Sequence, residues 1–495
     1  MTNTARAVVP VPQPTAPQPH LGAEEALARI RRFVEDRRMQ TRDKPGSFSD
    51  FEKELHAKVM EFEREMIAED MARADVDVEA VVVDGVTYRR VVRCEDTYFS
   101  AAGPVHIERT LYKDRTDETG RAICPMDLRL GILEGRWTPL AAQQATWVVA
   151  QMTPQLAEEL FARMGNMNPS KSSLDRLPKA LSARWEQERV HFEKALREGD
   201  IVPQQTVTVA VSLDGVHAPM KDGEAQAKRQ RTASEGRLTR GPAGYREVGC
   251  GALSFCDAEG EMISAVRMAR MPEPHKATLK RTLLLDVTAV LAERPDLRIV
   301  KLADGANDNW TYLSSILPGG TEVLDFYHAA EHLNAALGSV YGDGTVEARK
   351  RFEALRFVLR EEADGVGKVI RALDYLRRKH PKNKEVAKEL AYFRNNRHRM
   401  RYQQFAAGGL PIGSGVVEAA CKTLVTQRMK QSGMRWGEDG GQAILTLRGW
   451  TQSGDRFDRA WALLAATYQA EVVTLHNVVS FPPGGRPKGR RSASG

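Results

Sequence analysis

The chain has 495 residues, of which 42% are hydrophobic and 28% charged, and this ordinary globular composition excludes a wholly disordered or collagen-like protein. Its 72 Lys and Arg outnumber its 65 Asp and Glu, and the formal charge of +7 favours an anionic partner. The sequence contains neither an apolar signal segment nor a run of about 20 apolar residues, which argues against secretion and a membrane span. Five scattered cysteines without a C-x-x-C pair indicate a reduced, cytoplasmic protein.

The N-terminal part predicts a tail followed by helices and a hairpin. Residues 1–22 are rich in proline and predict a disordered tail. Residues 23–145 form a helical region with a β-hairpin: apolar residues three and four apart in 23–74 predict helices, and Asp84-Gly85 between valine-rich runs predicts a turn.

A helical pair is predicted in residues 146–200. Thr153 is a suitable N-cap, Pro154 suits the first helical position, and Gly165 closes the helix. A basic second helix follows, which Pro178 is expected to cut short. The outline resembles a helix-turn-helix DNA-binding region, although generic helical hairpins share it.

Residues 201–450 alternate between strands and helices and predict a mixed sheet covered by helices, in the order β-β-β-α-β-α-β. The expected elements are strands at 206–213, 249–255 and 262–268, a helix at 277–293, and strands at 297–302 and 321–326. An all-helical insertion is expected at about 333–407. Residues 451–480 predict a C-terminal helical segment, and 481–495 a basic disordered tail.

Three carboxylates in this region form a candidate metal site. Asp214 and Asp304 each follow an expected strand and precede glycine, an arrangement that places oxygen ligands for divalent cations at a sheet edge. Glu418 lies in the first turn of a helix entered through Gly413 and Gly415. Each feature alone is ordinary, since Asp-Gly is usually a turn and an N-terminal Glu usually compensates the helix dipole. Their combination and order are those expected of a ribonuclease-H-like sheet.

Asp214, Asp304 and Glu418 resemble the acidic triad of DDE transposases, most closely the bacterial insertion-sequence transposases of the ISKra-like group, which are related to Mutator-like transposases. In that group an Asp or Cys, two residues and a His follow the second catalytic Asp, and Asp325-Phe326-Tyr327-His328 matches this pattern. The helical insertion before the last acid also matches. The similarity covers roughly residues 206–447.

The resemblance implies an α+β multidomain protein with a ribonuclease-H-like catalytic domain. It implies cleavage at transposon ends and strand transfer into target DNA, with Mg²⁺ or Mn²⁺ held by the triad in two-metal phosphoryl transfer. The implied partners are double-stranded DNA, as terminal inverted repeats and target, and further copies of the chain in a homodimer or higher synaptic oligomer. We therefore expect a nucleoid-associated cytoplasmic enzyme of DNA transposition and recombination.

The second metal ligand is left open between Asp304 and Asp325, because both follow strands. We favour Asp304, which repeats the Asp-Gly design of Asp214, and this assigns Asp325 and His328 an auxiliary role. His328 would orient a phosphate or be a buried structural residue.

Cations near the acids are candidates for DNA binding, since backbone contacts to phosphates require Lys and Arg. Residues 201–495 hold 43 Lys and Arg against 32 Asp and Glu, whereas residues 1–200 hold 29 against 33. The basic loop between the first two strands is one candidate. The others are Arg394, Arg397, Arg399, Arg401, Lys422, Arg428, Lys430, Arg435 and Trp436.

Two other functions compete with this interpretation. His328, Glu331 and His332 fit H-x-x-E-H, in which two histidines bind zinc and the Glu acts as base of a metallopeptidase. Against it, His328 is expected at a strand end rather than on a helix. A non-catalytic DNA-binding regulator would use the helical pair of residues 146–200 and leave the triad without a role.

Overall fold

The computed structural model divides the chain into two compact units, each described here by itself. The first contains Met1–Ala145, Glu158–Lys171 and Ala465–Gly495, and the second contains Thr146–Ala157 and Ser172–Leu464. The residues described are 22–39, 47–117, 119–221, 244–315, 317, 319–413 and 415–475. The two predicted tails, except for Gly22, and residues 222–243 of the basic loop lie outside them.

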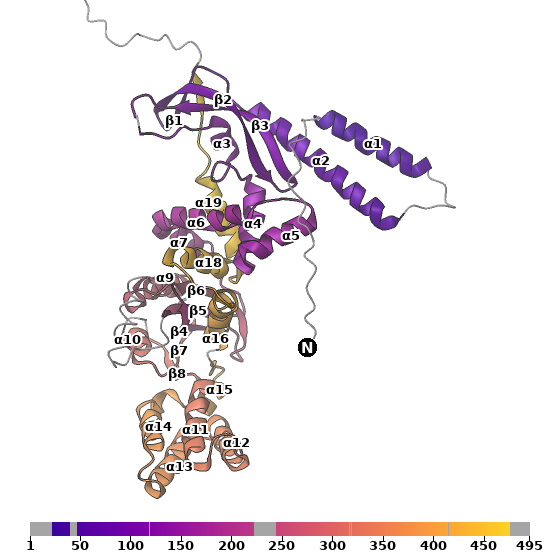
Figure 1. Ribbon diagram of the computed structural model, residues 1–495. Helices are drawn as coiled ribbons and strands as arrows, with labels where there is room; N and C mark the ends of the chain where they lie inside the picture. Colours follow the sequence, from indigo (N-terminus) through magenta and orange to yellow (C-terminus); the bar gives the residue numbers. More distant parts are fainter. Residues whose placement is uncertain are drawn as a thin grey trace, which may run out of the picture. The chain divides into compact units, whose positions relative to one another are not determined.

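The first unit combines two long helices with an antiparallel sheet in the order β3-β2-β1-β9 (Figure 1). The elements are α1 (Ala23–Met39), α2 (Phe48–Ala74), β1 (Ala80–Val83), β2 (Val86–Ser100), β3 (Gly103–Lys113), α3 (Pro125–Leu130) and β9 (Val473–Leu475). The predicted hairpin is confirmed: Val83 pairs with Val86, and Asp84 and Gly85 both have positive φ, as a tight hairpin turn requires. Tyr98, Ile107 and Met126 lie in the core of this unit.

Five further helices precede or follow the second unit's sheet in the chain. They are α4 (Pro139–Gln151), α5 (Pro154–Met164), α6 (Lys171–Gln187) and α7 (Arg189–Glu198), and near the C-terminus α19 (Arg456–Ala466). The predicted start of α5 is confirmed, because the amide of Leu156 donates to the Thr153 hydroxyl at 3.2 Å. The expected break at Pro178 is wrong. Pro178 is buried inside α6, so tertiary packing offsets the helical hydrogen bond that proline lacks.

The second unit is built on a five-stranded mixed sheet in the order β6-β5-β4-β7-β8. Its strands are β4 (Thr208–Pro219), β5 (Tyr245–Cys256), β6 (Met262–Arg270), β7 (Arg298–Ala303) and β8 (Thr321–Leu324). The first three along the chain are antiparallel neighbours, whereas β7 is parallel to β4 and β8 is parallel to β7. The predicted mixed sheet covered by helices is therefore confirmed.

Helices cover both faces of this sheet. Successive residues of a strand point to opposite faces: Leu253 of β5 packs with α9 (Ala277–Glu293), whereas Cys250 and Ala252 pack with the helix that begins at Gly415. Helix α9 has the predicted bounds. The C-terminal helical run is α16 (Gly415–Ala420), a π-helical segment (Cys421–Thr426), α17 (Gln427–Met429) and α18 (Glu438–Thr451).

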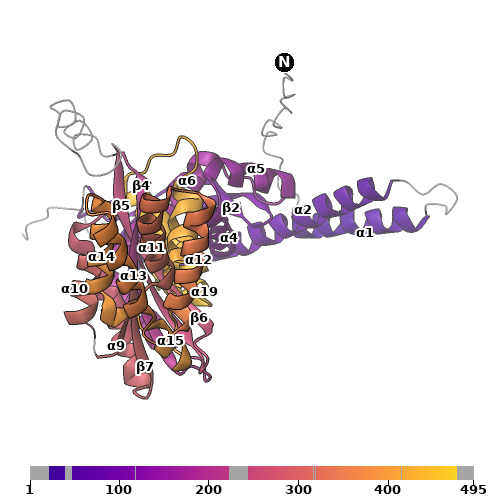
Figure 2. The ribbon, with the colours of Figure 1, turned by 90° about the horizontal axis from the view of Figure 1, so that it is seen from below.

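The predicted helical insertion is confirmed, and its helices lie side by side (Figure 2). They are α11 (Phe326–Tyr341), α12 (Val346–Glu361), α13 (Gly365–Lys379), α14 (Lys384–Asn395) and α15 (Tyr402–Ala407), and the short α10 (Asn307–Ser315) precedes β8. The insertion begins earlier than residue 333, because α11 begins directly after β8. No helix in the described ranges is long and apolar enough to cross a bilayer.

Two strand ends differ from the prediction. Strand β4 continues through Asp214 and Gly215 to Pro219, because β5 pairs with it residue by residue as far as Tyr245. Strand β8 ends at Leu324, and Asp325 is instead the N-cap of α11. His328 therefore lies in the first turn of a helix, and its expected place at a strand end is wrong.

Candidate active site

Asp214 lies within the central strand of the sheet rather than at its end. Its partner on β5 is Cys250, and cross-strand partners point to the same face, here the face covered by α16 and the π-helical segment. The Asp214 Oδ1 atom accepts a hydrogen bond from the Gly215 amide at 2.6 Å. Burial, together with the nearby carboxylate of Asp304, raises the pKa of Asp214. A raised pKa of this kind marks a carboxylate whose charge lacks full compensation from the protein.

Asp304 follows the last residue of β7, the strand that is parallel to β4. Its Oδ1 atom accepts hydrogen bonds from the Ala306 amide and from Nδ2 of Asn309, both at 3.1 Å. The same Nδ2 atom donates to the Leu213 carbonyl at 3.2 Å. Asn309 thus links Asp304 to the residue before Asp214, and its own Oδ1 atom is buried without a partner in the described structure.

The sequence interpretation missed Asn309. Its position in the first turns of α10 is the signal that could have revealed it, because a helix that begins just after a strand-end Asp turns its first side chains back toward that edge.

Glu418 is exposed in the first turn of α16. Three residues later Cys421 opens the π-helical segment, and its thiol donates to Oδ2 of Asp214 at 3.4 Å. The neighbouring Cys250 thiol and burial raise the pKa of Cys421, so the group stays a neutral donor. This contact brings the helix that carries Glu418 to Asp214. Single π-helical turns often occur at functional sites.

Asp325 and His328 lie at the same end of the sheet, at the start of α11. The Asp325 side chain accepts from the His328 amide at 2.6 Å and caps the helix. The entry to α16 approaches closely here: a Cβ on Gly413 would lie 3.0 Å from the Tyr327 ring and 4.0 Å from an Asp325 oxygen. Position 413 therefore favours glycine, because a side chain there would collide with Tyr327 of α11.

Two histidines, His328 and His332, lie close together on α11, the first helix of the insertion. The Nε2 atoms of His328 and His332 lie 3.3 Å apart, and Nδ1 of His332 lies 2.5 Å from a carboxylate oxygen of the buried Glu389. The Tyr392 ring stacks on His332 with centroids 3.7 Å apart. Burial, and the Asp304 carboxylate to a smaller extent, raise the pKa of Tyr392. The hydroxyl of Tyr392 is buried without a partner in the described structure, beside Gly305.

The donor chemistry of this edge suits a hard divalent cation. Asp214, Asp304 and Glu418 offer carboxylate oxygens, and Asn309 offers an unpaired buried amide oxygen, which are ligands that Mg²⁺ and Mn²⁺ accept. Within the described ranges, however, no three His, Cys, Asp or Glu side chains already converge on one metal position.

The candidate DNA-binding cations of the insertion mostly contact acids. Arg394 pairs with Asp374 and Arg397 with Asp364, each at 3.0 Å and on exposed surface. Arg399 pairs with Glu322 at 2.8 Å, and its guanidinium lies 4.0 Å from the centroid of the Trp310 ring. Arg401 is exposed.

The cations that follow Glu418 fall into two groups. Lys422, Lys430 and Arg435 are exposed, as a DNA contact would require. Arg428 is buried and lies over the half-buried Trp436, 5.2 Å from the ring centroid. Its side chain is therefore withdrawn from the exposed surface on which the other three cations lie.

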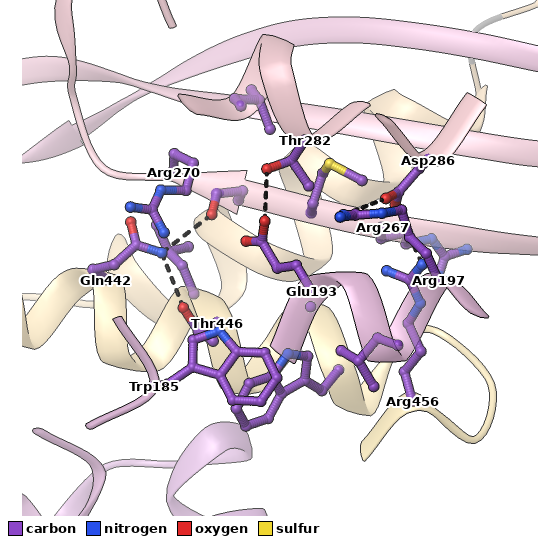
Figure 3. Close-up of a pocket in the computed structure, with 17 residues that line it drawn as sticks. Trp185, Glu193, Arg197, Arg267, Arg270, Thr282, Asp286, Gln442, Thr446 and Arg456 are labelled. Carbon is purple, nitrogen blue, oxygen red and sulfur yellow. Dashed lines mark hydrogen bonds and ion pairs between the residues drawn. The ribbon is translucent and has the colours of Figure 1, made fainter. Parts of the chain in front are cut away.

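A separate polar cavity lies between the sheet and helices α6, α7, α9 and α18 (Figure 3). Its charged groups satisfy one another: Asp286 pairs with Arg197 and Arg456, and the Thr282 hydroxyl donates to Glu193 at 3.2 Å. We interpret this cavity as a structural polar cluster that ties the helices to β6.

No model of a known protein family matches the sequence, and no curated protein matches it either.

Proposed function

We propose that the chain is a DDE-type DNA transposase that cuts transposon ends and transfers strands to target DNA. One observation carries the proposal: Asp214 lies on β4, Asp304 directly follows the parallel neighbour β7, and Asn309 links Asp304 to β4. The helix that bears Glu418 is docked on Asp214 by Cys421. The sheet order supports it, because β6-β5-β4-β7-β8, with the first three strands antiparallel, is the order expected of a ribonuclease-H-like domain.

The three acids would hold Mg²⁺ or Mn²⁺, which supplies an activated nucleophile and stabilises the leaving oxygen in phosphoryl transfer. The chain's own residues position this site. Asn309 fixes the Asp304 carboxylate through Oδ1, and Cys421 fixes the Asp214 carboxylate through Oδ2. The free lone pairs of both carboxylates then stay oriented toward the edge, so that less reorganisation is needed when the metal binds.

The exposed cations beside the acids would hold the DNA backbone. Lys422 and Lys430 follow Glu418 on the same helical run, and their exposed ammonium groups suit phosphate contacts. The partners proposed are terminal inverted repeats and target DNA, handled by a dimer or larger synaptic assembly in the bacterial cytoplasm.

Strand transfer in Mg²⁺ tests the proposal, with DNA ends taken from the repeats that flank the reading frame. We expect Asp214→Asn and Glu418→Gln to abolish cleavage and joining while DNA binding persists. Glu347→Gln, an exposed acid on α12, is the matched control and keeps full activity. Normal cleavage by the Asp214 or Glu418 variant would refute the triad.

The zinc alternative gains one observation, since His328 and His332 do lie on one helix with facing Nε2 atoms. A zinc hydrolase would contain stoichiometric zinc that is lost on substitution of His332 and retained in Asp214→Asn. A DNA-binding regulator would bind DNA and show no metal-dependent cleavage at all.

A further inference from the structure

A second cavity, of about 460 Å³, lies beyond the C-terminal end of β4. Trp436 closes it from a rigid position: its amide donates to the Pro219 carbonyl at 3.0 Å, and its own carbonyl accepts from the Lys221 amide at 2.7 Å. The indole Nε1 donates to the Met429 carbonyl at 3.0 Å, which fixes the ring. The volume is within the roughly 300–1,000 Å³ typical of small-ligand sites.

Arg428 places a buried positive charge in the lining of this cavity. The side chain is 2% exposed, and its only hydrogen bonds in the described structure run to the Val149 carbonyl at 3.4 Å and the Met434 sulfur at 4.0 Å. Its Nε atom has no partner, and no described carboxylate pairs with it. Burial, with the neighbouring Arg448, lowers the pKa of Arg428 to about 10, so the group is charged at neutral pH. Buried charges are normally paired, and this one lacks its anion.

The rest of the lining adds positive charge and a flat apolar surface. Lys221 and Arg435 are exposed at the cavity, whereas Lys179 already pairs with Asp175 at 2.5 Å. Gly437 also lines the cavity, and a Cβ added to it would meet no atom beyond its chain neighbours within 4 Å, so the cavity is open at this residue. An anion with a planar aromatic part fits both features, because cations bind phosphate and indole rings stack on bases.

We infer that this cavity binds a nucleotide, with its phosphate on Arg428, Lys221 and Arg435 and its base against Trp436. The nucleotide is either an unpaired one at a DNA end or a free nucleoside phosphate, and only the first source rests on the proposed function. Pro219, which bonds Trp436 at the cavity, lies five residues after Asp214 on β4. At about 3.3 Å per residue, the cavity therefore lies roughly 17 Å from Asp214. This distance corresponds to a few nucleotides of DNA.

Calorimetric titration in EDTA tests the site with four probes: dAMP, inorganic phosphate, a blunt duplex and the same duplex with one unpaired 3′ nucleotide. We expect Gly437→Phe, which fills the cavity at an ordinary φ, to weaken nucleotide binding at least tenfold. Arg428→Met should do the same. Gly319→Phe, at an equally open position outside the cavity, should bind as the wild type does.

The outcomes distinguish a DNA end from a free nucleotide as the ligand, and they test the nucleotide site separately from the transposase function. Tight binding of dAMP identifies a free nucleotide, and preference for the unpaired duplex end over dAMP and the blunt duplex identifies DNA. Wild-type affinity in folded Gly437→Phe, or phosphate binding as tight as dAMP, would overturn the inference. If strand transfer is absent while dAMP binding is lost in Gly437→Phe, the proposed function fails and the nucleotide site stands.

Discussion

The Cys421 thiol lies 3.4 Å from Oδ2 of Asp214, so a helix and a strand 207 positions apart in the chain meet at one carboxylate. The hydrogen bond fixes the side chain of Asp214 and the docking of the helix that carries Glu418. Cysteine here therefore positions an acid, and its raised pKa keeps it from acting as a thiolate nucleophile.

We predict that Cys421→Ala lowers strand transfer more than it lowers stability. The lost hydrogen bond should reduce the free energy of unfolding by about 0.5–1.5 kcal/mol, in addition to the loss of packing, and leave Asp214 less well oriented. Cys256→Ala is the control, since it removes a buried sulfur of β5 that forms no bond to Asp214. Activity and urea unfolding are measured for both; equal activity in the two variants would contradict a positioning role.

Asn309 provides the second prediction. Asn309→Ala leaves the buried Leu213 carbonyl and one Asp304 oxygen without this amide donor, which should cost about 1–3 kcal/mol of unfolding free energy. Activity should fall as well, because Asp304 loses its orientation. Asp308→Ala, at an exposed position on the same helix that pairs with Lys280 at 2.9 Å, should cost at most about 1 kcal/mol. Unchanged stability in Asn309→Ala would show that the hydrogen bonds of Asn309 to Leu213 and Asp304 do not stabilise the fold.

Local signals in the sequence predicted most elements of the sheet domain, and long-range pairing explains the exceptions. Helix α9 has a strong apolar period and ends before Pro295, so its bounds follow from the sequence. Strand β4 passes through Asp214-Gly215 because β5 supplies partners there, which no local pattern reveals. The candidate ligands Asp214, Asp304 and Glu418 were proposed from their residue types, their spacing and the resemblance to the DDE triad. Asn309 and Cys421 were not. The place of Asn309 just after Asp304 was a local signal that was overlooked, whereas the role of Cys421 arises from a tertiary contact with Asp214.

The ion pair of Arg399 and Glu322 predicts a pH-dependent contribution to stability. Burial alone would raise the pKa of Glu322, but Ser314, Arg399 and Lys301 together lower it below the ordinary value of 4.5. A lowered pKa means that the folded state binds the proton less tightly, so the stabilisation is present above about pH 4.5 and is lost as the pH falls further.

Glu322→Gln should therefore lower the melting temperature at pH 7 and lower it less at about pH 3.5. Glu353→Gln removes an exposed partner of Arg356 at 3.7 Å and should have little effect at either pH, since such pairs contribute about 0–1 kcal/mol. A Glu322→Gln effect that is equal at both pH values would contradict the ion-pair explanation.

The pair of Asp286 and Arg456 predicts the largest loss of stability. Asp286 is 3% exposed, and its two oxygens accept from Arg197 at 3.3 Å and Arg456 at 3.2 Å. Arg456 also pairs with Asp200, so it connects the start of α19 to α9 and to the end of α7. Removing Arg456 leaves the buried Asp286 with Arg197 as its remaining cation in the described structure.

Arg456→Met should cost about 3–5 kcal/mol of unfolding free energy, the usual penalty for breaking a buried pair from one side. The double variant Asp286→Leu/Arg456→Met should lose less than the sum of its single variants, because it removes both uncompensated charges together. Arg351→Met on the exposed face of α12 should change stability by at most about 0.5 kcal/mol. Urea unfolding of Asp286→Leu, Arg456→Met, their double variant and Arg351→Met measures this coupling. Strictly additive losses would show that Asp286 and Arg456 contribute independently.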